Sequence, residues 1–229
     1  MPPVRKRPRP PAREPFTRLA PDTRRAQIMF EAERLFATRP NADFGVGEVA
    51  QGAGVTPGLV YHYFESKEGL LAAVCDLRAR ELLQASLADS SLAPIEQVER
   101  GVKGYMDFVE AHRLVYLNLF KSPAAIHPEI VRICEDTRQA IVEHFVVSLG
   151  LAKKKVPALR VALRGHLGYS ESVILRWLEE QTVPRTVIEQ LSFANIGSAL
   201  ESGLRIDGAM PAAQIEQLMQ AYRSYFVPA

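Results

Sequence analysis

The sequence predicts an all-α protein with a helix-turn-helix unit near its N-terminus and a larger helical domain after it. Apolar residues recur three and four positions apart through most of the chain, whereas no segment alternates convincingly with period two. A glycine-containing turn separates two short helical segments early in the chain. The 229 residues are 47% hydrophobic and 24% charged, which is typical of a globular protein long enough for a small domain and a larger one.

The first 18 residues predict a disordered, extended arm. Six prolines exclude regular secondary structure, and the segment has almost nothing apolar to bury. Six basic side chains against one acidic give residues 1–18 a net charge of +5, whereas residues 19–75 carry −2 and residues 76–229 carry −1. Two interpretations stay open. The arm is a tail that only aids solubility, or its Arg5, Arg7 and Arg9 follow DNA beside the folded domain.

Residues 19–75 are expected to form the helix-turn-helix domain, which begins with two helices. The first starts with Asp22 as its N-cap and ends before Pro40. The second covers residues 46–53, and Gly54 supplies the positive φ that ends it.

Two more helices follow. Thr56 is the expected N-cap of the third helix, with Pro57 at the first helical position and Phe64 at the end. Ser66 caps a fourth, long helix that continues to about Leu82.

The second and third helices form a helix-turn-helix pattern, in which the later helix enters the DNA major groove. Val60 and Phe64 lie four residues apart and are expected to face a small core. The side chains that project to the other side, toward DNA, are Tyr61, His62 and Tyr63. A tyrosine hydroxyl suits a phosphate oxygen, and an imidazole can donate to a base or a phosphate. Lys67 adds an ammonium beside backbone N–H groups that favour an anion.

Residues 54–71 read GVTPGLVYHYFESKEGLL and follow the segments LFATRP and VGEVAQGA. This pattern resembles the DNA-binding domain of the TetR (tetracycline-repressor-like) family over residues 22 to about 75. The resemblance implies that Lys67 contacts phosphate and that the DNA-facing surface consists of Thr56, Pro57, Gly58, Leu59, Tyr61, His62 and Tyr63. The family usually has Thr or Ser at the start of the second helix, where this chain has Gly45, Val46 and Gly47.

Helical patterns continue through residues 76–229, the predicted second domain. Apolar stripes indicate helices over about 95–109, 130–145, 159–177, 187–204 and 211–226. Residues 114–120, LVYLNLF, are apolar on every side except Asn118, which predicts a helix buried all round. A lone buried amide needs a partner, so Asn118 either bonds a neighbouring backbone carbonyl or points into a ligand cavity.

The resemblance also implies nine or ten helices, with a C-terminal part that binds a small molecule and forms a homodimer. Pockets combine aromatic side chains with a few polar tips, although most aromatic residues at helical spacing are core. The candidate pocket residues are Tyr105, Tyr116, Asn118, Phe120, His166, Tyr169 and Trp177. The dimer interface is expected within about 159–204, where the small residues are Gly165, Gly168, Ser172, Ala194, Gly197 and Ala199. The alternative is that they pack helices inside one subunit.

No cofactor or metal is expected, because no histidine of the second domain pairs at i, i+4 with another histidine or a carboxylate in a metal-binding motif. Cys75 and Cys134 have no paired spacing and are expected to be reduced core residues, which favours a cytoplasmic location. No apolar run approaches the roughly 18 residues that span a bilayer. No apolar segment follows the basic N-terminus as in a secretory signal.

These features favour a one-component transcriptional regulator, acting as a repressor. A homodimer would bind a palindromic double-stranded DNA operator, and a small-molecule effector would shift the population of DNA-binding-domain separations. An architectural DNA-binding protein without a ligand is the alternative. An all-α enzyme is least favoured, because the segment Tyr169-Ser170-Glu171-Ser172 lacks the second glycine of a nucleophile elbow and no other catalytic motif is present.

Overall fold

The computed structural model of the chain describes residues 21–39, 43–87, 91–121 and 127–224. These residues form ten helices, and no strand occurs among them, which confirms the all-α prediction. The helices are α1 (Pro21–Thr38), α2 (Val46–Gly52), α3 (Pro57–Phe64), α4 (Lys67–Ser86), α5 (Pro94–Ala111), α6 (Arg113–Lys121), α7 (Pro128–Ser148), α8 (Pro157–Glu180), α9 (Arg185–Asp207) and α10 (Ala212–Ser224). None of them is long and apolar enough to cross a membrane.

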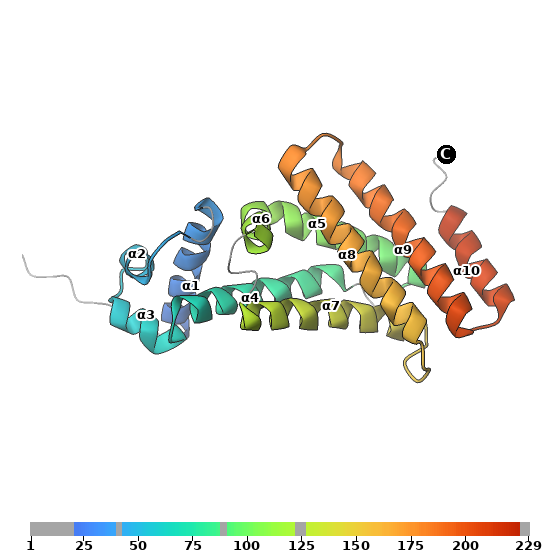
Figure 1. Cartoon of the computed structure of the whole chain (residues 1–229), viewed down its shortest axis with the longest axis horizontal. Helices are drawn as coiled ribbons and strands as arrows, with labels where there is room; N and C mark the ends of the chain where they lie inside the picture. The colour runs from blue at the N-terminus through green and yellow to red at the C-terminus, as the bar shows by residue number, and fades with distance from the viewer. Residues whose placement is uncertain (1–20, 40–42, 88–90, 122–126, 225–229) are drawn as a thin grey trace, which may run out of the picture.

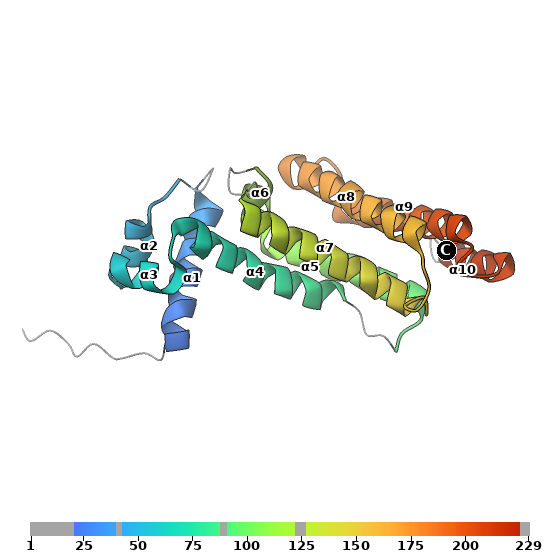
Figure 2. The same ribbon diagram turned by 60° about the horizontal axis from the view of Figure 1, so that its bottom comes forward.

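The molecule is elongated, with a small head and a larger body (Figure 1). The head consists of α1, α2 and α3, which gather at one end, and the body consists of α5 to α10. α4 leaves the head and runs beside α7 into the body, and α5 packs against it as well (Figure 2). α8 and α9 form the most extensive helix pair, with α10 packed on α9 at the end far from the head.

The head begins its helices where the sequence predicts, with one difference. Thr56 is the N-cap of α3 with Pro57 at its first position, and Gly54 has φ +64° in the turn before it. The Ser66 hydroxyl accepts a hydrogen bond from the Gly69 amide at 2.9 Å and so caps α4. Asp22 is not the N-cap of α1. It lies in the first turn, because the helix already begins at residue 21. Its negative charge there interacts favourably with the positive end of the helix dipole.

A tight γ-turn joins α3 to α4. Glu65 has φ 62° and ψ −43°, and the Ser66 amide donates to the Phe64 carbonyl at 2.6 Å. This is the rare and strained form of the γ-turn. The same Phe64 carbonyl faces Gly69, where a Cβ atom would collide with it. Gly69 therefore allows α4 to pass close to the end of α3 and fixes the angle between the two helices.

The α8–α9 pair is held by a close crossing and by a cap between helices. A Cβ atom on Gly203 would lie 2.5 Å from Cα of Leu159, so the glycine lets the two backbones approach closely. The Asp207 carboxylate at the end of α9 accepts hydrogen bonds from the backbone amides of Ala158 and Leu159, at 3.0 and 2.8 Å. α9 thereby satisfies two of the amides that the first turn of α8 leaves unpaired.

The burial of α6 differs from the prediction. The helix over residues 113–121 is not buried all round, because Leu114 is 48% exposed and Tyr116 alone is buried among the residues described there. α6 packs on α1, α5 and α8 but leaves one side to solvent. The sequence pattern could not show this, since an apolar run has no polar stripe to mark the outer face.

Candidate DNA-binding surface and cavities

The exposed surface of the head centres on α3. Thr56, Pro57 and Gly58 at its N-terminus are exposed, and Leu59 is half-buried. Val60 and Phe64 are buried in the head core, as predicted.

The aromatic residues after Val60 divide in a way that the sequence analysis did not predict. Tyr61 is 51% exposed, and His62 is exposed too. Tyr63 is half-buried, and its ring packs against the head core rather than projecting freely. In an eight-residue helix, three consecutive residues span most of the helix circumference, so one of them has to turn back toward the core.

Two cations flank the C-terminal end of α3. The Arg25 guanidinium of α1 lies over the Phe64 ring, 5.0 Å from its centroid, and the Lys67 ammonium of α4 lies over the Phe44 ring at 4.7 Å. Such contacts hold a cation in place while leaving its outer side to an anion. Arg25 was missed by the sequence analysis, because its distance from α3 depends on the packing of α1, and no local pattern encodes that.

The start of α2 keeps one of the two hydrogen bonds of a capping box. Gly45 is the N-cap residue, and its backbone amide donates to the Glu48 carboxylate at 3.0 Å. Arg39 pairs with the same carboxylate at 2.6 Å. The Gly45 amide, and then Arg39, lower the pKa of Glu48. Glu48 therefore satisfies the Gly45 amide. Gly45 has no hydroxyl that could accept from the Glu48 amide, which donates to the Gly45 backbone carbonyl at 3.1 Å instead.

A first cavity lies at the end of the body nearest the head, enclosed by α4, α5, α6, α7 and α8. It contains about 800 Å³ of space free of atoms, part of which is open to solvent. Its wall is mostly aliphatic and aromatic, and Phe36 of α1 closes the side toward the head. The polar and sulfur-bearing side chains in its lining are Cys75, Arg78, Tyr105, Tyr116, Cys134, Thr137, Arg138 and Glu171.

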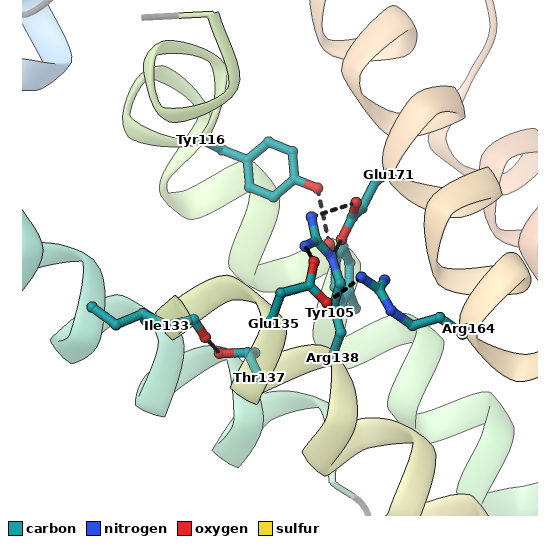
Figure 3. Close-up of polar contacts among 8 residues, drawn as sticks. All are labelled: Tyr105, Tyr116, Ile133, Glu135, Thr137, Arg138, Arg164 and Glu171. Atoms are coloured by element: carbon teal, nitrogen blue, oxygen red, sulfur yellow. Dashed lines mark hydrogen bonds and ion pairs between the residues drawn. The ribbon is translucent and has the colours of Figure 1, made fainter. Parts of the chain in front are cut away.

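Each polar group of the first cavity has a protein partner. Arg138 pairs with Glu171 through two hydrogen bonds of 2.6 and 2.9 Å (Figure 3). The hydroxyls of Tyr105 and Tyr116 lie 2.8 Å apart, and the Thr137 hydroxyl donates to the backbone carbonyl of Ile133 at 2.7 Å. Burial raises the pKa of both tyrosines, so both stay protonated at neutral pH.

Other ion pairs and hydrogen bonds complete this wall. Arg78 pairs with Glu33 of α1 at 2.5 Å and also with Glu81. The free thiols of Cys75 and Cys134 share a hydrogen bond, which together with burial raises the pKa of Cys75. The first cavity therefore offers an apolar space whose charges are already neutralised.

A second cavity adjoins the first deeper in the body. It contains about 540 Å³ of atom-free space, again counting the part open to solvent. Tyr105, Ile141 and Leu167 line both cavities. The further lining residues are Ser86, Gly101, Val102, Met106, Phe145, His166, Ser170, Ile174, Ser192 and Ile196.

The structure brings together four of the seven predicted pocket residues. Tyr105, Tyr116 and Phe120 line the first cavity, and His166 lines the second, as Tyr105 does. Tyr169 lines neither of these two cavities. Trp177 does not line them either. It lies in a separate buried cluster, where its indole N–H donates to the backbone carbonyl of Val183 at 2.9 Å.

Asn118 takes the first of its two alternatives. Its amide donates to the backbone carbonyls of Phe36 and Ala37 at the end of α1, at 2.5 and 3.4 Å. It does not line either cavity. Phe36 of the head therefore has two roles: its backbone carbonyl accepts the hydrogen bond from Asn118 of α6, and its ring lines the first cavity.

The predicted contacts of Arg5, Arg7 and Arg9 lie outside the described residues, as does the whole arm of residues 1–18.

Comparison with known proteins identifies the family of this fold. The family described as "Bacterial regulatory proteins, tetR family" matches residues 28–74, and that described as "Tetracyclin repressor-like, C-terminal domain" matches residues 94–197. The chain belongs to the TetR family. It is a DNA-binding transcriptional regulator of the helix-turn-helix type, as the head predicts.

Individual TetR-family relatives extend the comparison. The regulator EthR of Mycobacterium tuberculosis is 40% identical over 72 residues, which are 31% of this chain and 32% of EthR. The chain thus spans about a third of the length of this relative. The transcriptional activator FasR of Mycolicibacterium smegmatis is 24% identical over 152 residues, 64% of this chain and 69% of FasR. A TetR-family regulator from Streptomyces coelicolor has the same fold, with a TM-score of 0.74 at 23% identity over 90% of both chains.

Proposed function

We propose that this TetR-family protein is a repressor that binds a palindromic DNA operator as a homodimer and releases it when a small molecule occupies the body. The observation that carries the proposal is the position of the first cavity. Its wall includes Phe36 of the head, and α4, which begins at the end of the recognition helix α3, forms another wall. A ligand there contacts the elements that set the position of the head. Because a bacterial transcriptional regulator binds chromosomal DNA, the protein acts in the cytoplasm.

We divide the chain at residue 75, so that residues 19–75 form the DNA-binding domain, residues 76–229 form the effector-binding and dimerisation domain, and residues 1–18 form the arm. The core of the first domain ends on α4 with Leu70, Leu71, Val74 and Cys75. Ile130 and Ile133 of α7 pack into the same core, so the two domains share buried contacts. Such contacts allow a change in the body to move the head.

The proposed DNA-binding residues are Thr56, Pro57, Gly58, Leu59, Tyr61, His62, Tyr63 and Lys67, with Arg25 added from the structure. Tyr61→Phe removes one hydroxyl and should cost about 0.5–1.5 kcal/mol of operator binding if that hydroxyl bonds a phosphate. Lys67→Ala and Arg25→Ala should each weaken binding. Each should also reduce the slope of log affinity against log salt by about 1, the effect of losing one phosphate contact.

Fluorescence anisotropy with an operator selected from random DNA measures these effects. Arg223→Ala is the matched control, since this arginine is exposed on α10 at the far end of the molecule. Unchanged operator affinity in all three head variants would reject the proposed surface.

The proposed dimer interface is the exposed face of α8 and α9. Gly165, Gly168, Ser172 and Ala194 are exposed there, and a Cβ atom on either glycine would meet no other atom of the same chain within 4 Å. Gly197 is different, because it packs against the Tyr222 ring of α10 inside the subunit, and Ala199 is half-buried. Gly197 therefore serves packing within one chain.

Light scattering at micromolar concentration tests the dimer. We expect twice the chain mass of 25.5 kDa for the wild type, and a large shift toward monomer in Gly168→Arg. A wild-type mass near 25.5 kDa would count against both the dimer and a two-headed operator complex.

A reporter gene under the selected operator distinguishes the modes of regulation. A repressor lowers expression until an effector is added, whereas an activator such as the relative FasR raises it. An architectural DNA-binding protein would show no response to any small molecule that enters the first cavity.

A further inference from the structure

The two cavities differ in the state of their polar groups. Each polar side chain that lines the first cavity has a protein partner. In the second cavity, the hydroxyls of Ser86 and Ser192 have no hydrogen-bond partner among the described residues. Ser192 is 3% exposed, so bulk water does not reach its hydroxyl freely.

Unpartnered buried hydroxyls are costly, because a hydroxyl that leaves water without a new hydrogen bond loses free energy. Ser192 lies on α9 and Ser86 at the end of α4, so the two hydroxyls reach the second cavity from different helices. His166 also lines this cavity. Its Nδ1 lies 2.9 Å from Asn195 Oδ1, and its Nε2 lies 3.5 Å from the hydroxyl of Ser170, another lining residue. A convergent set of hydrogen-bonding groups therefore surrounds this space.

This set carries no charge. Burial lowers the pKa of His166, so its imidazole is neutral at pH 7. No Asp, Glu, Lys or Arg lines the second cavity in the part of the chain that the structure describes. An ionised head group would lose its hydration there without gaining a counter-charge, which is strongly unfavourable. A neutral donor or acceptor loses less and gains hydrogen bonds to the serines.

The first cavity favours the same kind of molecule. The Arg138 guanidinium is occupied by Glu171, and Arg78 is occupied by Glu33 and Glu81. The rest of the wall is suited to an aliphatic or aromatic body. Because Tyr105, Ile141 and Leu167 belong to both walls, the two spaces are adjacent and only these side chains divide them, so a molecule that occupies both displaces the Tyr105 ring.

We propose that the two cavities form one effector site for an elongated, uncharged molecule with an apolar body in the first cavity and a neutral hydrogen-bonding group, such as an alcohol, an amide or an ester, at Ser86, His166 and Ser192. This inference rests on the proposed function, because it names the class of the effector. The hydroxyls of Ser86 and Ser192 hold the head group. Tyr105 stands between the two parts of the site.

A matched set of probes tests the class of head group. Dodecan-1-ol, dodecanamide and sodium dodecanoate share a chain length and differ in the charge and chemistry of the end group. Trp177, the chain's one tryptophan, reports binding by its fluorescence, because it is buried in a cluster with Met106 and Ile174, which both line the second cavity. At pH 8 and below micelle-forming concentrations, we expect the alcohol and the amide to bind the full-length protein at least tenfold more tightly than dodecanoate.

One serine variant, measured beside a control, tests an assigned contact. Ser192→Ala should weaken binding of the alcohol and the amide by about 3- to 10-fold, the usual effect of one lost hydrogen bond. In the absence of any probe the same variant should raise the melting temperature, because it removes an unpartnered buried hydroxyl. Ser224→Ala on α10 is the matched control, since Ser224 is exposed, lines neither cavity and should change neither quantity.

Three outcomes would overturn the inference. The first is dodecanoate binding as tightly as the neutral probes, which would place the head group at Arg138. The second is a Ser192→Ala variant with unchanged probe affinity, which would mean that a buried water satisfies the serines. The third is the absence of any probe binding to the wild type.

These outcomes are separable from failure of the proposed function. Ala79→Phe places a ring in the first cavity without touching the second. If this variant abolishes dodecanoate binding, the first cavity is an effector site although the head-group assignment is wrong. Operator affinity and dimer mass are measured without a probe, so they test the proposed function independently of the effector class.

Discussion

Single residues around α3 decide both the shape of the head and how much of it the sequence could predict. The burial of Val60 and Phe64 and the exposure of Tyr61 follow from helical spacing, and the structure confirms them. The half-burial of Tyr63 and the position of Arg25 over Phe64 do not follow from spacing. They depend on how α1 and α3 pack, which is tertiary information.

The γ-turn at Glu65 gives a testable consequence at this scale. Glu65→Gly should stabilise the protein by about 1 kcal/mol, because glycine adopts a positive φ without steric cost. Gly69→Ala should destabilise it, since the added methyl group collides with the Phe64 carbonyl, and overpacking of this kind costs about 1–3 kcal/mol. Thermal unfolding followed by circular dichroism measures both. Opposite signs are expected for the two variants, and a stabilised Gly69→Ala protein would show that the turn relaxes freely.

Whole helices were the most predictable part of this molecule. The proline and cap signals at Pro57 and Ser66 mark real helix starts, because these residues act on the backbone next to them. The amphipathic pattern failed for α6, whose apolar residues mark no outer face. The amphipathic pattern also could not predict the cavities, because their walls come from helices far apart in the chain and their volume depends on how the helices cross.

The cap between α8 and α9 is testable at the scale of the element. Asp207→Ala should destabilise the protein by about 2 kcal/mol, because two partly buried backbone amides of α8 lose a charged acceptor. Asp136→Ala is the control, since Asp136 is exposed and pairs with Arg132 on the surface, where an ion pair contributes less than about 1 kcal/mol. Urea unfolding of both variants measures the difference. Equal losses of stability would mean that the Asp207 bonds contribute no more than a surface pair.

The charge distribution of the whole molecule bears on how it finds DNA. Residues 19–75 carry a net charge of −2, and the arm of residues 1–18 carries +5. If Arg5, Arg7 and Arg9 follow the flanking DNA, two or three phosphate contacts in each arm of a dimer contribute roughly 4 to 5 units to the slope of log affinity against log salt. Deleting residues 2–18 should flatten that slope and weaken binding to all sequences without changing the preferred bases. A truncated protein that keeps the full slope would show that the arm only aids solubility.

Asn118 and Phe36 connect the cavity to the head in the intact protein. The amide of α6 bonds the end of α1, and the ring of the same α1 residue lines the first cavity. A ligand that displaces the Phe36 ring therefore acts on the segment of the head that α6 holds. The ligand can change operator affinity only by as much as its own affinity differs between the two head positions.

The most direct test of this account is the operator affinity of a protein whose first cavity is filled. Ala79→Phe fills it from α4, and Ala213→Phe adds the same ring at an exposed position of α10 as the control. With dimer mass and helix content unchanged, fluorescence anisotropy should show operator binding at least tenfold weaker for Ala79→Phe and unchanged for Ala213→Phe. Equal operator affinity in the two variants would contradict the claim that the first cavity controls the head.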